Sequence, residues 1–164
     1  MSKLYVNEIN EKSGDSVTIK TNDTTAINVN GDGIVTLPKK PHIRLNPYNS
    51  DDVNGIANAA VVQESTILEW SNDRVIVPVA GLYLVCLNFI SDSGTGREDA
   101  HIVVNGSEIV SVLSSDNGTG YRQKNATIVV DLDVDDYVQF SCMDWYNISN
   151  PNERWRTASM TLLG

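Results

Sequence analysis

The sequence predicts an all-β protein in which a ten-strand sandwich of the jelly-roll type follows an elongated, β-rich stalk. Apolar residues recur two positions apart in short runs, which is the period of a strand with one buried face. Turn formers separate these runs, and no segment has the length and periodicity of an amphipathic helix. The 164 residues, 41% apolar and 20% charged, suffice for one sandwich domain and a short arm.

The first forty residues carry short apolar runs separated by turn formers, and they predict a stalk. The apolar residues expected to be buried there are Val6, Ile9, Val17, Ile19, Ile27, Val29, Val35 and Leu37. Strands of about three residues cannot offset the cost of ordering the backbone, which is ~1–2 kcal/mol per residue. We therefore expect three copies to wind about a common axis and to cover these residues at a trimer interface. The alternative is an arm without fixed structure.

The boundary between the stalk and the head is expected at Pro38-Lys39-Lys40-Pro41, because two prolines stiffen the chain and remove two hydrogen-bond donors from any sheet. Residues 1–40 then form the stalk, and residues 41–164 form the head. Within the head, ten apolar runs separated by turn signals predict ten strands and favour a jelly-roll sandwich. The predicted strands are residues 42–45, 60–62, 65–70, 73–77, 81–90, 101–104, 108–113, 126–132, 137–143 and 155–163.

Most of these strands alternate apolar and polar residues, which is typical of a sheet with one face in the core. Residues 81–90 differ because they are apolar on both faces. Such a strand lies in the middle of a covered sheet, and in a small sandwich the second cover is expected to be a neighbouring subunit. Leu84 and Leu87 are the candidate residues at that contact.

Several segments of the head resemble the C1q/TNF-like jelly-roll family. The matching segments, in order, are residues 77–84 with their Gly-x-Tyr strand start, residues 103–108, and residues 128–132 leading into Asp136-Tyr-Val138. The resemblance covers about residues 41 to 164, with two departures. Asp135 replaces the usual glycine of a turn, and residues 158–161 replace the aromatic ending of the family. The resemblance implies a compact homotrimer about a threefold axis, with exposed loops that bind other macromolecules.

The N-terminal segment carries a second resemblance. Residues 4–9, followed by Ser13-Gly14 and residues 17–19, look like the N-terminal segments of bacteriophage tail-fibre and other virion appendage proteins. This resemblance implies attachment to the particle, and to other virion proteins, through residues 1–40. The first residues contain no apolar stretch of a secretory signal. We therefore expect assembly in the host cytoplasm and a final place in the virion.

The charge balance narrows the choice of partners. The formal net charge is −9, and a surface of that sign repels the phosphates of nucleic acids and anionic lipid headgroups. No stretch reaches the ~18 apolar residues of a membrane span. We expect neither a nucleic acid nor a membrane as a partner.

Two cysteines occur, Cys86 and Cys142, each within an apolar run. Both are interpreted as small, buried strand residues with free thiols. A disulfide between them is the alternative, because pairing cannot be deduced from spacing.

The residues that catalysis or metal binding requires are sparse. His42 and His101 are the two histidines, and no nucleophile, zinc-protease or phosphate-loop motif occurs. Residues 131–136 begin like a calcium loop, but the glycine and the distal glutamate are missing. They are interpreted as a strand end entering a turn, although carboxylates such as Asp51-Asp52 could gather an ion on a trimer axis. We expect no catalytic residue, cofactor or bound metal.

Aromatic residues provide the candidate recognition site. Trp145, Tyr146, Arg154 and Trp155 flank or belong to one polar segment, and Trp, Tyr and Arg dominate interface energies. The alternative role for these residues is packing within or between subunits. Asn105-Gly106 is a separate signal and predicts a tight hairpin turn.

Together these features predict a non-enzymatic structural protein of a bacteriophage virion. It would be a homotrimeric fibre or spike, attached through its N-terminus, whose head binds a host-surface glycan or protein. A capsid decoration protein without receptor binding is the alternative. A glycan-active enzyme with paired carboxylates is a third hypothesis, which would require turnover that is lost on changing an aspartate to asparagine.

Overall fold

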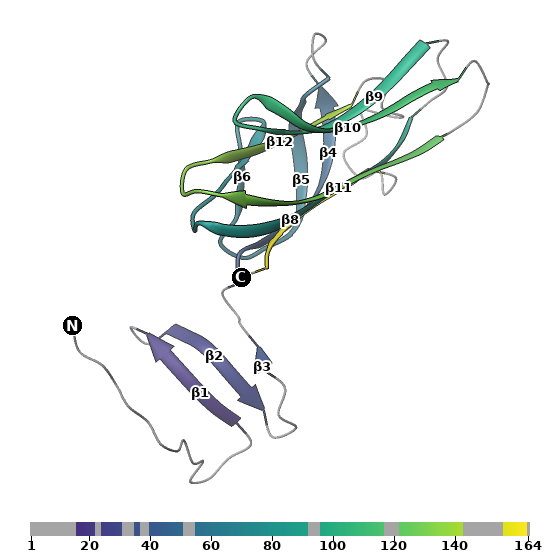
Figure 1. The fold of residues 1–164 in the computed structure, drawn as a ribbon. Helices are drawn as coiled ribbons and strands as arrows, with labels where there is room; N and C mark the ends of the chain where they lie inside the picture. The colour runs from purple at the N-terminus through teal and green to yellow at the C-terminus, as the bar shows by residue number, and fades with distance from the viewer. Residues whose placement is uncertain are drawn as a thin grey trace. The chain divides into compact units, whose positions relative to one another are not determined.

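The computed structural model describes residues 16–21, 24–30, 35–36, 40–50, 55–91, 96–116, 122–142 and 156–163. The chain forms two compact units, Met1–Lys39 and Lys40–Gly164. Every regular element in the described part is a β-strand (Figure 1).

The N-terminal unit contains a three-stranded antiparallel sheet in the order β1-β2-β3. Its strands are β1 (Ser16–Thr21), β2 (Thr24–Asn30) and β3 (Val35–Thr36). The register pairs Val17 with Val29 and Ile19 with Ile27. Because directly opposed residues of an antiparallel pair point to the same face, these four apolar side chains share one face of the sheet.

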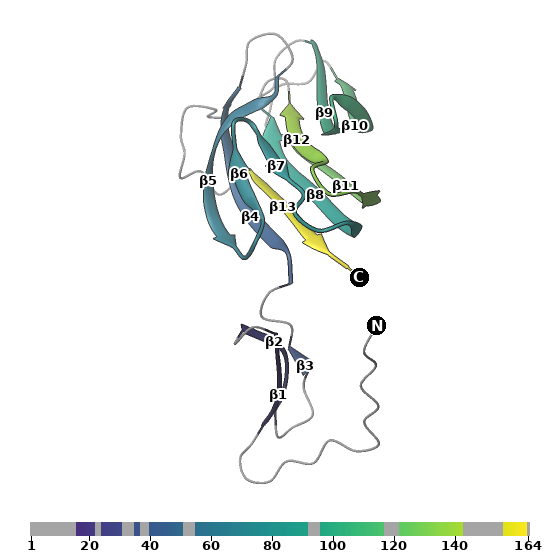
Figure 2. The same ribbon diagram turned by 90° about the vertical axis from the view of Figure 1, so that its left-hand side faces the viewer.

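The described residues of the head unit form ten strands in two five-stranded antiparallel sheets. The β8 sheet has the order β11-β8-β13-β4-β5, and the β12 sheet has the order β10-β9-β12-β7-β6. The strands are β4 (His42–Ser50), β5 (Ala57–Ser65), β6 (Glu69–Ser71), β7 (Arg74–Ile76), β8 (Gly81–Ser91), β9 (Gly96–Val104), β10 (Ser107–Asp116), β11 (Arg122–Leu132), β12 (Tyr137–Cys142) and β13 (Thr157–Leu162). Figures 1 and 2 show the two sheets as the two layers of a sandwich. The predicted all-β, ten-strand jelly-roll head is confirmed.

The core lies between the two sheets and is built by alternate residues of each strand. Its largest fully buried apolar side chains include Tyr83, Phe89, Phe140, Ile43, Ile102 and Met160. Leu87 belongs to this core and is 1% exposed, so the expectation that it contacts a neighbouring copy is wrong. Leu84 is half-buried. The two residues are an odd number of positions apart, and side chains that alternate along a strand must then point to opposite faces.

The central strand of the β12 sheet is buried on both faces, although its alternation predicts one polar, open face. Gln139 is 5% exposed and Ser141 is 2% exposed, although both point away from the core. The side-chain amide of Gln139 donates to Asp73 Oδ2 at 2.9 Å, and Ile56 forms an isolated bridge with Ser141. Polar side chains can be buried here because they have hydrogen-bond partners.

The strand directions place the connections at two ends of the sandwich. The head begins at Lys40, where Leu162 N donates to Pro41 O at 2.9 Å at the end of β13. The registers of β8 with β11 and β13 show that β8 ends where those two strands begin. The chain leaves β12 at Cys142 and re-enters the described part at Arg156, both at the end away from Lys40.

Candidate subunit interface

One face of the β8 sheet has the composition of a contact surface. Since Tyr83, Val85, Leu87 and Phe89 point into the core, the residues between them point to the other side. We call the outward residues of β8 and of its two neighbours the β8 outer face. It consists of Leu82, Leu84, Cys86, Asn88 and Ile90 on β8, of Gln123, Asn125, Thr127, Val129 and Asp131 on β11, and of Thr157, Ser159, Thr161 and Leu163 on and just after β13.

The β8 outer face is almost free of charge. Within this set Asp131 alone is charged, at the end of β11, in a chain that is 20% charged. Interfaces between proteins are depleted of charge at their centres in the same way. A lysine or glutamate at the centre of this sheet would have kept it solvated, so the composition favours a covered surface.

The β8 outer face is apolar at one end and polar at the other. Leu82, Val129 and Leu163 are 42%, 49% and 43% exposed, and Leu163 N donates to Leu82 O at 2.7 Å. At the other end the side-chain amide of Gln123 donates to Asn88 Oδ1 at 3.2 Å. Covering each of the three exposed apolar side chains would contribute about 1 kcal/mol.

Charged residues lie beside this face, on β4 and β5. The His42 Nε2 atom is 3.6 Å from Glu64 Oε1, with side chains 27% and 69% exposed. Arg44 is exposed and is the register partner of Glu64. An uncharged centre with a charged margin matches the usual division of an interface into core and rim.

Cys86 lies on the β8 outer face and not in the core. Its thiol is free and half-buried, between Thr127 and Ser159 in the register. The interpretation of Cys86 as a core residue is therefore wrong, because the core-facing positions of β8 are the odd-numbered ones. The side chain of Cys142 lies outside the described part.

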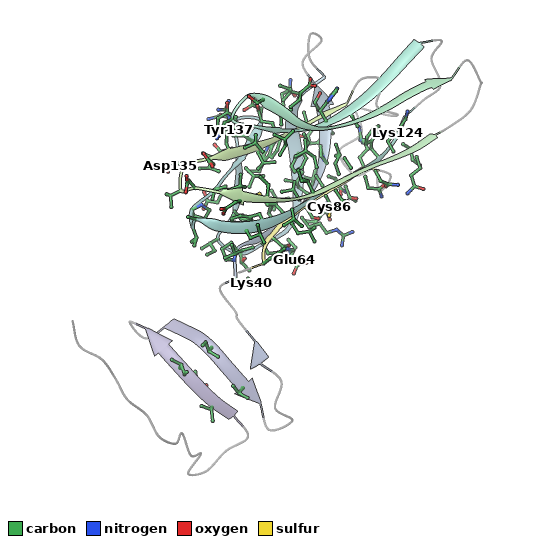
Figure 3. All side chains as sticks on the ribbon, in the orientation of Figure 1. Lys40, Glu64, Cys86, Lys124, Asp135 and Tyr137 are labelled. Atoms are coloured by element: carbon green, nitrogen blue, oxygen red, sulfur yellow. The ribbon has the colours of Figure 1, made fainter. Side chains whose placement is uncertain are left out.

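The N-terminal sheet carries another apolar face, in addition to the β8 outer face, and its own described strands do not cover it. Val17, Ile27 and Val29 are half-buried, and Ile19 is 43% exposed. Figure 3 shows side chains projecting from the short N-terminal sheet. A sheet this small has no second layer of its own among the described residues of its unit, so it needs another surface to bury these side chains.

The remaining candidate residues can be located only in part. Val35 is described by its backbone, which pairs with Val29. The other candidates lie outside the described residues: Val6, Ile9, Leu37, Trp145, Tyr146, Arg154, Trp155 and the pair Asp51-Asp52.

The acidic run at the end of β11 forms a turn. Asp136 Oδ2 accepts a hydrogen bond from Asp133 N at 2.8 Å, and Asp136 Oδ1 accepts one from Asn105 Nδ2 at 2.7 Å. The bond from Asn105, and then the one from Asp133, hold the pKa of Asp136 below its usual value. Both carboxylate oxygens thus serve the turn, as the interpretation of residues 131–136 as a strand end requires.

The described residues also bear on metal binding and on membrane spans. No group of three or more His, Cys, Asp or Glu side chains in this part of the chain is arranged to hold a metal ion. No helix there has the length and apolarity of a membrane span.

Sequence reasoning missed part of the β8 outer face. Leu82, Val129 and Leu163 were not among the candidate contact residues, although all three are exposed and apolar. A signal for Val129 exists, because residues 128–130 are apolar at consecutive positions and so on both faces of β11. The contribution of Leu163 depends on its backbone bond to Leu82, which no local pattern indicates.

The comparisons with known proteins agree with this fold. The sequence matches no protein-family model and none of the curated proteins. Among solved structures, it is similar to the crystal structure of murine APRIL at pH 8.0, with a TM-score of 0.61 and 15% sequence identity over 76% of this chain and 100% of that chain. APRIL belongs to the TNF family. At this identity the likeness concerns the fold, and the head of this chain therefore has a TNF-like jelly-roll fold.

Proposed function

We propose that this protein is a non-enzymatic, homotrimeric structural protein of a bacteriophage virion. In this proposal residues 1–40 form the stalk that attaches to other virion proteins, and the head contacts a host-surface glycan or protein. The observation that carries its self-association is the presence, among the described residues, of two separate uncovered faces, one on each unit of the same chain; the virion role rests on the resemblance of the N-terminal segment. Self-association would cover both at once.

The β8 outer face supports association of the heads. Its centre lacks charge, and Leu82, Leu84 and Val129 can be covered by neighbouring copies arranged about a common axis. The TNF-like fold supports the same arrangement, because the resemblance of the head to the C1q/TNF-like family implies three subunits about an axis. A threefold arrangement also suits the N-terminal sheet, because it brings three apolar faces together.

The direction of the strands supports a binding role for the end of the head away from Lys40. The segment that contains Trp145, Tyr146, Arg154 and Trp155 leaves β12 and returns to β13 at that end. Aromatic and arginine side chains supply most of the energy in many protein interfaces. Lys40 connects the head to residues 1–39 at the other end.

The first test is the mass of the full chain in native mass spectrometry and light scattering. The 18.0 kDa chain should give a species of three times its mass, and a monomer at micromolar concentration would refute the proposal. Binding of the trimer to host cells, lost on changing Trp145 and Trp155 to alanine together, would support adhesion. Binding to empty shells without binding to cells would identify a capsid decoration protein instead.

A further inference from the structure

The turn between β9 and β10 is an Asn-Gly pair in a left-handed conformation. Asn105 has a φ of 51° and Gly106 a φ of 77°, which are the angles of a two-residue hairpin turn. Asn-Gly is also the pair in which asparagine deamidates most readily. The backbone nitrogen of the glycine attacks the asparagine side chain, and no glycine side chain shields that nitrogen. The contacts of this turn therefore influence how fast Asn105 deamidates.

Both ends of the Asn105 carboxamide are held by the turn that follows β11. Its Nδ2 donates to Asp136 Oδ1 at 2.7 Å, and its Oδ1 accepts from Tyr137 N at 3.0 Å. The backbone N of Asn105 also donates to Tyr137 O at 3.1 Å. We call these three bonds the Asn105 clasp. It joins the β9–β10 hairpin to the connection between β11 and β12, which crosses from one sheet to the other, and the bonded residues are 31 to 32 positions apart in the chain.

The partners of Asn105 are themselves fixed. Asp136 Oδ2 accepts from Asp133 N at 2.8 Å, and the carbonyl of Asp136 accepts from Val77 N at 2.8 Å. The guanidinium of Arg74 lies 4.4 Å from the ring centroid of Tyr137. Figure 3 shows Tyr137 and Asp135 close together at the left side of the head. The partners of Asn105 are therefore held in place by bonds of their own, although the two side-chain bonds of the clasp are exposed to solvent.

Deamidation requires the carboxamide to turn away from these partners. The backbone nitrogen of Gly106 must attack Cγ of Asn105, so that an N–Cγ bond forms and the Cγ–Nδ2 bond breaks. The amide nitrogen leaves as ammonia with the proton given up by Gly106, and water then opens the ring to aspartate or isoaspartate. In the clasp, Cγ is held toward Asp136 and Tyr137 by two hydrogen bonds, both of which must break first.

We propose that Asn105 is a guarded deamidation site, protected by Asp136 for as long as the clasp is closed. The reaction is one-way, because ammonia is lost and the product cannot restore the clasp. An aspartate at position 105 would present a second carboxylate to that of Asp136, and an ionised carboxylate is only an acceptor. Isoaspartate would add a backbone atom to a two-residue turn. Either product would separate the β9–β10 hairpin from the β11–β12 connection at this end of the sandwich.

The test measures conversion of Asn105 in the full chain by peptide mapping that resolves aspartate from isoaspartate. In the native protein the conversion should be at least about tenfold slower than in the same chain held unfolded in urea, since a hydrogen bond to a charged group is worth that factor. Asp136→Ala should lose most of this protection. The matched control Asp131→Ala removes a carboxylate that belongs to the β8 outer face and should keep the protection.

Two results would overturn the proposal. One is equal conversion in the native and the unfolded wild-type chain, which needs no variant. The other is unchanged or slower conversion in Asp136→Ala, which would mean that the carboxylate promotes the reaction. If Asp136→Ala does not give a cooperative melting transition, Asp136→Asn serves in its place, because it keeps one acceptor oxygen and loses the charge and the second acceptor. Its protection should fall between those of the wild type and the unfolded chain, and full protection would argue against Asp136 as the guard. The inference does not depend on the proposed function.

Discussion

Replacing Leu84 by aspartate is the most direct test of the β8 outer face. Leu84 is half-buried in the single chain and lies between Val129 and Thr161 in the register. In the single chain the new carboxylate can reach water, so the folded monomer should lose at most about 1 kcal/mol. In the trimer the carboxylate would be buried without a partner.

The expected effect on assembly is large because each trimer contains the change three times. An unpaired buried charge costs about 3–5 kcal/mol, so three copies cost roughly 9 kcal/mol or more. At about 1.4 kcal/mol per tenfold change, the dissociation constant of the trimer should rise by roughly six orders of magnitude. At micromolar concentration Leu84→Asp should therefore be a monomer.

Sedimentation and light scattering measure the mass of the variant, and circular dichroism measures its melting. Ile76→Asp is the matched control, because Ile76 is 44% exposed and lies on the β12 sheet. The control should remain a trimer. A trimer of Leu84→Asp with unchanged melting would refute the assignment of the β8 outer face. An unfolded monomer would show that the carboxylate cannot reach water in the single chain, which would contradict the half-buried position of Leu84.

Three further predictions concern the head alone. Leu87→Ala should lower the free energy of unfolding by about 2–5 kcal/mol, because it leaves a cavity between the sheets; a loss below about 1 kcal/mol in denaturant unfolding would contradict its burial. Tyr83→Phe removes the hydroxyl that donates to Val79 O at 2.7 Å and should cost about 1 kcal/mol at neutral pH. Burial raises the pKa of Tyr83 above its usual 10.0, so Tyr83 ionises at a lower pH in the unfolded chain than in the folded one. The stability of the wild type should therefore fall as the pH rises above 10.0, and that of Tyr83→Phe should fall less. The pKa of Asp136 is lowered from 3.8 by the hydrogen bonds from Asn105 and Asp133. The contribution of Asp136 to the free energy of unfolding is therefore present above pH 3.8 and is lost as the pH falls through the lower pKa of the folded state. Asp136→Asn should flatten this part of the curve of stability against pH, and an unchanged curve would count against the clasp.

The strands of the head could be predicted because their signal is local. Alternation with a period of two, together with turn formers, located all ten of them, and Asn105-Gly106 predicted the hairpin turn that the structure shows. The predicted lengths were less accurate. β9 and β11 begin at Gly96 and Arg122, earlier than the apolar runs indicate, because their polar first residues also pair in the backbone ladder.

The candidate interface could be predicted only in outline. Residues 81–90 are apolar on both faces, so the sequence alone could not decide whether Leu84 or Leu87 faces outward. The register of β8 with two neighbours decides it, because Leu87 faces the other sheet and Leu84 does not. The sequence alone could not predict the burial of Lys124 and Arg156 either. They are 4% and 0% exposed, although lysine and arginine are rarely fully buried.

By itself the sequence determined what neighbouring residues control: an all-β chain, the alternation of each strand, and the turns between strands. Steric preference and side-chain period act over a few residues, so they can be read along the chain. Tertiary structure alone decided which apolar face enters the core, and which side chains of distant turns meet, as Asn105 and Asp136 do. These outcomes depend on the pairing of strands far apart in sequence, for example β8 with β13, and such pairing is fixed only when the two sheets pack together.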